Sequence, residues 1–138
     1  MSSRRRSRQR ALQILFFWDA RRQPVDDVLR AYYETLVAEE HPGRDPFADE
    51  LATGTIQHVQ EVDDRIGRHA EHWRMERMPA VDRNLLRLAV YEMTYAGTPP
   101  AVAIDEALEL ARKFSNEESV QFVNGVLDAV HRELAPSV

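Results

Sequence analysis

Apolar residues recur every three or four positions along nearly the whole chain, and this helical period constrains the fold more than any other feature. After Pro24, for example, Val25, Val28 and Leu29 fall on one face of a helix. No segment alternates between apolar and polar residues as a half-buried strand does. Helix breakers separate the periodic segments at Pro24, at residues 41–46, at Pro79 and at residues 97–100. The sequence therefore predicts an all-α protein.

About seven helices are expected, over residues 3–22, 25–40, 47–70, 80–96, 101–114 and 116–134, with a short turn of helix around Trp73. Gly97 is expected to end one helix in the left-handed conformation, and Ser115 with Glu118 forms a capping-box signature for the last helix. The break at residues 71–80 divides the chain into an N-terminal half, about 3–70, and a C-terminal half, about 71–134. Because each half is small, residues 1–138 are expected to form one domain with a shared core.

The composition argues against several kinds of site. The chain has no cysteine, which excludes disulfides and thiolate metal sites and suits a reducing cytoplasm. No apolar run approaches the roughly 18 residues that a membrane span needs. His69 and His72 lie three residues apart, but no nearby cluster supplies the further ligands of a metal site, so exposed positions are expected for both.

Arrangements typical of catalysis are also missing from the sequence. Neighbouring acids such as Asp63 and Asp64 point about 100° apart on a helix, so they do not converge on one substrate atom. No phosphate-binding loop, dinucleotide fingerprint or nucleophile elbow occurs. We therefore expect a protein that is not an enzyme and that uses no cofactor.

Charge is divided unevenly along the chain, whose net charge is −5. Residues 1–22 hold seven arginines and one acid, whereas the rest of the chain holds 11 basic and 22 acidic residues. A basic end on an acidic body predicts a local contact with a polyanion, and arginine suits both phosphates and bases. On a helical wheel one stripe offers charge, an amide and an aromatic ring to single-stranded RNA. This stripe consists of Arg6, Arg10, Gln13 and Phe17. A solvated tail is the alternative interpretation of the arginines.

The acidic helix faces of the second half also have two interpretations. Most such acids only face solvent, but the charge division would also let a basic protein dock on them. The acids concerned include Glu92, Glu106, Glu109, Glu117 and Glu118. On the second interpretation the chain is a protein-interaction scaffold and its arginines are incidental. A monomer and a homodimer both remain open, since apolar helix faces serve either state.

One glycine and two tryptophans suggest where helices pack. Gly125 lies inside a helical segment, where glycine costs ~1 kcal/mol relative to alanine. Its presence predicts the close approach of another helix, with Asn124 semi-buried beside it, and a surface for a partner is the alternative interpretation. Trp18 and Trp73 are expected in the core or at its edge.

Several segments together resemble a known family. Residues 82–92 read Asp-Arg-Asn-Leu-Leu-Arg-Leu-Ala-Val-Tyr-Glu and follow Trp73 and Arg77. Residues 100–114 and the run Phe-Val-Asn-Gly-Val-Leu-Asp at 122–128 continue the pattern, and the arginines of residues 4–10 precede Ala-Leu-Gln at 11–13. Over nearly its whole length the chain resembles the NusB family of bacterial transcription antitermination factors.

The resemblance implies two roughly perpendicular helical subdomains that share a core. It implies binding to the boxA element of ribosomal RNA leader transcripts together with NusE, a small-subunit ribosomal protein. The complex would join RNA polymerase and suppress premature termination. The RNA-binding residues expected from the resemblance and the wheel are Arg4, Arg5, Arg6, Arg8, Arg10, Gln13, Phe16 and Phe17. Phe16 stands where the family usually has Tyr, and is preferred over Phe17 as the stacking ring. Asp82 and Glu118 align with acidic positions that influence RNA or partner binding.

Overall fold

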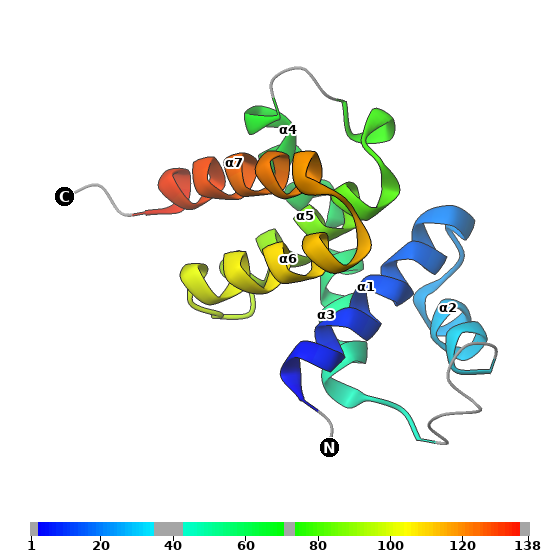
Figure 1. Ribbon diagram of the computed structural model, residues 1–138. Coiled ribbons are helices and arrows are strands. Elements are labelled where there is room, and N and C mark those ends of the chain that lie inside the picture. The colour runs from blue at the N-terminus through cyan, green and yellow to red at the C-terminus, as the bar shows by residue number, and fades with distance from the viewer. Residues whose placement is uncertain (1–2, 35–42, 71–73, 136–138) are drawn as a thin grey trace.

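The computed structural model describes residues 3–34, 43–70 and 74–135 of the chain (Figure 1). These residues form seven α-helices, one turn of 3-10 helix and no strand, which confirms the all-α prediction. The helices are α1 (Arg4–Arg21), α2 (Val25–Tyr32), α3 (Pro46–Gln57), α4 (Val59–His69), α5 (Ala80–Thr94), α6 (Pro100–Phe114) and α7 (Glu117–Leu134), and the 3-10 turn is η2 (Met75–Arg77). Within the described segments, no helix combines the length and the hydropathy needed to cross a membrane.

Helix α5 lies at the centre of the molecule, in contact with α1, α3, α4, α6 and α7 (Figure 1). Residues 84–90 of this helix are all buried. A helix enclosed on every side must place polar groups in the interior, and those groups need partners there. Two of them, Arg87 and Glu92, reach α1 through ion pairs, so α5 also fixes the position of the arginine-rich helix.

Three clusters of buried apolar side chains hold the helices together. The first joins α1, α2 and α3 and includes Leu88 of α5. The second joins α4, α5, α6 and α7. The third is smaller and packs Leu12 of α1 against Leu85 of α5 and Leu110 of α6. The apolar half of α1 is therefore part of the core, and Trp18 is buried there as predicted.

The prediction of one helix over residues 47–70 is wrong. Helix α3 ends at Gln57 and α4 begins at Val59, with His58 between them at φ −107° and ψ 16°. Both the backbone N–H of His58 and its ring Nδ1 lie within hydrogen-bond distance of the Gly54 carbonyl oxygen. The break lets α3 pack against α1 while α4 packs against α5 and α7. The end of the helix expected over 25–40, and Trp73, lie outside the described residues.

The structure confirms one helix-end prediction and corrects another. Gly97 has φ 72°, the left-handed conformation expected after α5. The N-cap of α7 is Asn116, not Ser115: its side chain accepts the backbone N–H of Ser119 at 2.9 Å. The capping box with Glu118 is therefore wrong by one residue, because Asn116 has the extended backbone that a cap requires.

The expected close approach at Gly125 is also wrong. Gly125 and Asn124 are exposed, and a Cβ added at Gly125 would meet no atom of the described structure within 4 Å. Close packing occurs instead at Gly54 of α3, where an added Cβ would overlap the ring and hydroxyl of Tyr91.

Candidate nucleic-acid interface

Helix α1 is ordered along the arginine-rich segment, so these arginines are not a solvated tail. Ser3 caps the helix from an extended backbone (φ −115°, ψ 160°), and its hydroxyl oxygen accepts the N–H of Arg6 at 3.1 Å. At the other end Arg22 is left-handed (φ 53°), and its N–H donates to the Trp18 carbonyl at 2.6 Å. The side chains of α1 therefore start from fixed backbone positions.

Near its C-terminal end α1 is held by Asp19. This carboxylate accepts hydrogen bonds from Arg83 at 2.8 Å and from Asn84 at 3.2 Å, and lies 3.1 Å from Nη1 of the buried Arg87. Burial by itself would raise the pKa of Asp19, but the Arg83 hydrogen bond and the charge of Arg87 outweigh it and lower the pKa to about 2. The Asp19 cluster thus fixes α1 against α5.

Arg8 makes a buried ion pair and does not face solvent. Its Nε and Nη2 donate to Glu92 of α5 at 2.9 and 2.8 Å, and its Nη1 donates to Glu106 of α6 at 3.4 Å. The side chains of Arg8 and Glu92 are only 6% and 2% exposed. The hydrogen bond with Glu92 raises the pKa of Arg8 despite its burial. This arginine links three helices and has no free donor face for RNA.

Arg10 and Ser7 point to the other side of α1, where both contact Asp45. Arg10 Nη1 and the Ser7 hydroxyl each donate to Asp45 Oδ2 at 2.8 Å, and Asp45 Oδ1 accepts the Ala48 N–H as the cap of α3. Burial raises the pKa of Asp45, but the hydrogen bonds from Ala48, Ser7 and Arg10 together lower it. Arg10 therefore holds the start of α3 against α1.

The three remaining arginines of residues 4–10 are exposed. The Arg4 guanidinium lies 4.6 Å from the centroid of the Phe47 ring. Arg5 is 65% exposed and its Nη2 lies 2.8 Å from Glu106 Oε2. The Arg6 side chain makes neither a hydrogen bond nor an ion pair with any residue that the structure describes. A ligand can therefore bind the Arg6 guanidinium without breaking an ion pair or a hydrogen bond of the protein.

The outward stripe of α1 differs from the one that the wheel indicated. It consists of Arg6, Gln9, Gln13 and Phe16, all of which are exposed or half-exposed. Phe17 turns towards α2, where its ring meets Tyr32 edge-on at 5.9 Å, and Gln13 accepts the Tyr32 hydroxyl at 2.7 Å. Both phenylalanines are half-buried, but the ring of Phe17 packs against the first core cluster, so these contacts favour Phe16 over Phe17 as the ring available to RNA.

The sequence interpretation missed a second part of this surface, at the C-terminal end of α6. Lys113 Nζ donates to Gln9 Oε1 at 2.9 Å, which joins α6 to the outward stripe of α1. Phe114 is 40% exposed, and Lys113 Nζ lies 5.4 Å from its ring centroid.

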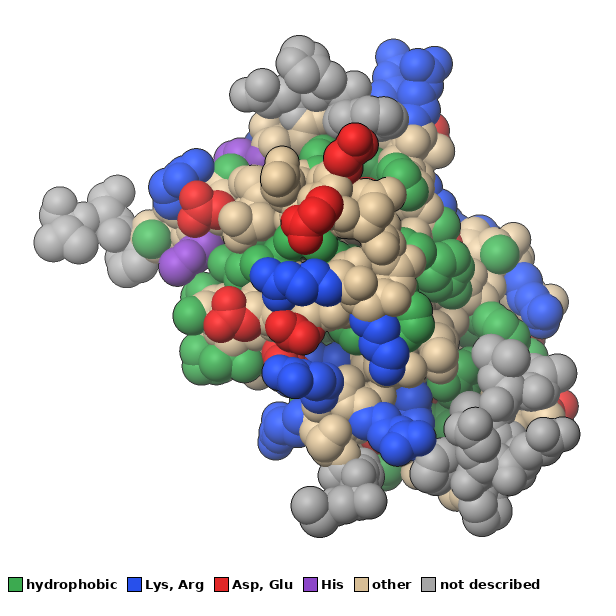
Figure 2. All heavy atoms as spheres, viewed as in Figure 1, with side chains coloured by type: hydrophobic (Ala, Val, Ile, Leu, Met, Phe, Trp, Pro, Cys, Tyr) green, Lys and Arg blue, Asp and Glu red, His purple; other side chains and the backbone are tan. Residues whose placement is uncertain are grey.

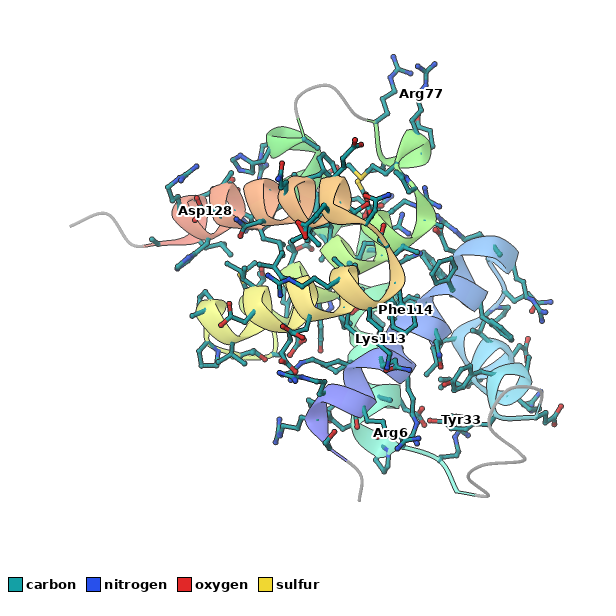
Figure 3. The ribbon with its side chains drawn as sticks, in the orientation of Figure 1. Arg6, Tyr33, Arg77, Lys113, Phe114 and Asp128 are labelled. Atoms are coloured by element: carbon teal, nitrogen blue, oxygen red, sulfur yellow. The ribbon has the colours of Figure 1, made fainter. Side chains whose placement is uncertain are left out.

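Figure 3 shows these two side chains on the same face as Arg6, and Figure 2 shows cationic side chains gathered over α1 and α6 there. The sequence shows a lysine next to an aromatic residue at positions 113 and 114, which is a pattern typical of nucleic-acid binding. It does not show that this pair lies next to α1, because that depends on tertiary contacts. We call Arg6, Gln9, Gln13, Phe16, Lys113 and Phe114 the basic face.

Two acids that were expected on a solvated face point inward instead. Glu92 is buried against Arg8, and Glu106 is 13% exposed between Arg5 and Arg8. Glu109 is exposed and lies 3.0 Å from Arg112, so its charge is also offset. The continuous acidic face that a basic partner would need is therefore interrupted.

Asp82 and Glu118 are brought together where α5 and α7 begin. They line a hollow of about 270 Å³ together with Pro79, Asn116, Ser119 and Phe122. Asp82 is 3% exposed and its Oδ2 accepts the Ser119 hydroxyl at 3.1 Å, whereas Oδ1 has no hydrogen-bond partner in the described part of the chain. Burial raises the pKa of Asp82. Glu118 is exposed at the rim, separate from the arginines of α1.

A family model described as the NusB family matches residues 5–132. The chain belongs to the NusB family. The transcription antitermination protein NusB of Solibacter usitatus is 76% identical over 134 residues, which cover 97% of this chain and 92% of that protein. The NusB protein of Koribacter versatilis is 50% identical over 133 residues, covering 96% of this chain and 90% of that protein.

Solved structures agree with this membership in the NusB family. T. maritima NusB superposes with a TM-score of 0.81 at 36% identity, over 98% of this chain and 94% of that one. A chain in a crystal structure of a plectonemic RNA supercoil has a TM-score of 0.86 at 28% identity, over the full length of both. A chain in the crystal structure of antitermination factors NusB and NusE in complex with double-stranded RNA has a TM-score of 0.81 at 27% identity, covering 94% of this chain and 96% of that chain.

Proposed function

We propose that this chain is an RNA-binding transcription antitermination factor that acts by binding and not by catalysis. In this proposal it binds the boxA element of ribosomal RNA leader transcripts together with NusE, in the cytoplasm, and helps RNA polymerase avoid premature termination. The observation that carries the proposal is the basic face, present on a chain of the NusB family. The names of its relatives and the solved complex of NusB and NusE with RNA support it.

The basic face offers the groups that single-stranded RNA requires. Arg6 and Lys113 supply positive charge for phosphates from two different helices. Gln9 and Gln13 follow Arg6 along α1 and can hydrogen-bond to base edges, and Phe16 offers a ring on which a base can stack. Phe114 adds a second ring next to Lys113. Arg4 and Arg5 extend the charge towards the N-terminus.

The buried arginines have a different part in this proposal. Arg8 and Arg10 hold α1 against α5, α6 and the start of α3 through Glu92, Glu106 and Asp45. A surface that is rigid before binding loses less conformational entropy when the ligand arrives. Arg8 and Arg10 thus position the basic face and do not themselves need to contact RNA. The small cluster that joins α1 to α5 and α6 supports treating residues 1–138 as one domain.

Asp82 and Glu118 are proposed to modulate binding of RNA or of NusE. The hollow that they line opens beside the start of α7, and Asp82 keeps one carboxylate oxygen without a partner among the described residues. A ligand bound in this hollow would lie against Asp82 and Glu118.

The experiment compares two pairs of arginine or lysine changes. Arg6→Ala with Lys113→Ala removes two charges from the basic face, and Arg74→Ala with Arg77→Ala removes two exposed charges from the region of η2, well away from it (Figure 3). Binding of a boxA-type RNA is measured by fluorescence anisotropy over a salt series, with and without NusE.

The change on the basic face should weaken binding by about tenfold or more and reduce the log–log salt slope by about 1.4, since each single-strand phosphate contact contributes ~0.7. The control pair should leave the RNA affinity of the protein largely unchanged. Equal effects of the two pairs would mean that charge acts without regard to position, and the proposed interface would be wrong.

A further inference from the structure

Glu106 is the one described carboxylate that contacts two arginines of the N-terminal segment at once. Its Oε2 accepts from Arg5 Nη2 at 2.8 Å and from Arg5 Nε at 3.2 Å. Its Oε1 accepts from Arg8 Nη1 at 3.4 Å. The Glu106 side chain is 13% exposed, whereas that of Arg5 is 65% exposed. Glu106 is therefore a largely buried carboxylate that holds the exposed guanidinium of Arg5.

The two arginines depend on Glu106 to different degrees. Arg8 is already paired with Glu92, which accepts three of its hydrogen bonds and also the Thr98 hydroxyl. Arg5 has Glu106 as its one side-chain partner among the described residues. If Arg5 turns towards another anion, Glu106 keeps Arg8 and is not left as an unpaired, largely buried charge. Exchange of the partner of Arg5 is thus inexpensive for the protein.

We infer that Glu106, beside the basic face, helps to determine RNA affinity, because it pairs with Arg5 in the free protein and competes there with an RNA phosphate. This inference rests on the proposed RNA-binding function. Arg5 and Arg6 are adjacent in the sequence and both exposed, but the carboxylate of Glu106 pairs with Arg5 and not with Arg6. Phosphate must displace Glu106 at Arg5, whereas at Arg6 it meets a free guanidinium.

The competition has two measurable consequences. Without the carboxylate of Glu106, Arg5 has no ion pair to give up, and RNA affinity should rise about two- to fivefold, the range expected when one exposed ion pair no longer has to be broken. The surface at Arg5 also carries one more uncompensated positive charge, so the log–log salt slope of RNA binding should become steeper by about 0.7.

The test uses Glu106→Gln, which keeps the size of the side chain and its ability to accept a hydrogen bond from Arg8. Asp105→Asn is the matched control: it removes the same charge from the neighbouring, exposed position of α6, whose side chain makes no hydrogen bond or ion pair with any described residue. Both variants are then made in an Arg5→Ala background, and a single-stranded boxA-type RNA is titrated against each protein over a salt series.

Glu106→Gln should tighten binding and steepen the salt slope, Asp105→Asn should do so less, and the gain from Glu106→Gln should vanish without Arg5. Equal gains from the two variants, or a gain that survives Arg5→Ala, would show a general charge effect and overturn the inference.

A second comparison, in which Glu106 is intact, also tests the inference: Arg5→Ala should weaken RNA binding less than Arg6→Ala. If the wild-type protein binds but these two losses are equal, the inference fails while the proposed function stands. If no protein of the set binds RNA, the proposed function fails and the inference fails with it.

Discussion

The ion pair between Arg8 and Glu92 gives a quantitative test of the division between structural and RNA-contacting arginines. Arg8→Ala leaves Glu92 buried at 2% exposure, with the Thr98 hydroxyl but without its charged partner. Removing one member of a buried ion pair typically costs about 3–5 kcal/mol. Domains of this size have a total free energy of unfolding of about 5–15 kcal/mol, so the variant should lose a large share of its stability. The melting temperature should fall by roughly 10 °C or more.

The assay is urea unfolding followed by circular dichroism at about 222 nm, with the fluorescence of the two tryptophans, Trp18 of α1 and Trp73, as a second probe. Arg6→Ala is the matched control, since it removes the same side chain type from the same helix at an exposed position. It should change the free energy of unfolding by no more than about 0.5 kcal/mol. Arg8→Met combined with Glu92→Leu should recover most of the loss, because an apolar pair of similar volume replaces the ion pair.

The reasoning would be refuted if Arg8→Ala unfolded within about 1 kcal/mol of the wild-type protein. If that variant also lost RNA binding while remaining stable, Arg8 would be an RNA contact. The placement of the basic face on the opposite side of α1 would then be wrong.

Two further predictions concern Asp19 and two glycines. The pKa of Asp19 is lowered from 3.8 to about 2, so its contribution of about 2 kcal/mol is present at neutral pH and is lost as the pH falls from about 4 to 2. In urea unfolding at a series of pH values, Asp19→Asn should therefore reduce the fall in the free energy of unfolding between about pH 4 and pH 2. An unchanged fall would contradict the proposed role of the Asp19 cluster. Gly54→Ala should destabilise the protein by about 1–3 kcal/mol because the methyl overlaps Tyr91, whereas Gly125→Ala should stabilise it by up to ~1 kcal/mol. Thermal unfolding of both variants tests these two expectations, and equal shifts of the two melting temperatures would contradict them.

Local sequence signals placed most helices correctly because they depend on neighbours within one or two turns. The apolar period gave the bounds of α1, α5, α6 and α7 to within two residues. Gly97 ended its helix as expected, because a left-handed residue is required there and glycine adopts that conformation without strain. The break at His58 was missed, since it involves neither glycine nor proline and depends on α3 and α4 packing against different helices.

Glycine packing could not be decided from sequence position. Gly54 and Gly125 both lie inside helices, but Tyr91 closes over one of them and nothing covers the other within the described structure. A glycine destabilises a helix through its own backbone freedom, which is visible in the sequence. Whether close packing offsets this destabilisation depends on the element that lies opposite, which is not.

The arginines show the same division most clearly. Charge and helical period are properties of a segment, so they were enough to predict that α1 is basic, helical and partly buried. The sequence by itself did not determine which arginines would face a ligand. Only the tertiary structure brings Glu92, Glu106 and Asp45, all distant in sequence, to Arg8, Arg5 and Arg10, and leaves Arg6 without a carboxylate. The physical reason is that the availability of a charge depends on its partner and its solvent exposure, and both are set by which helices meet.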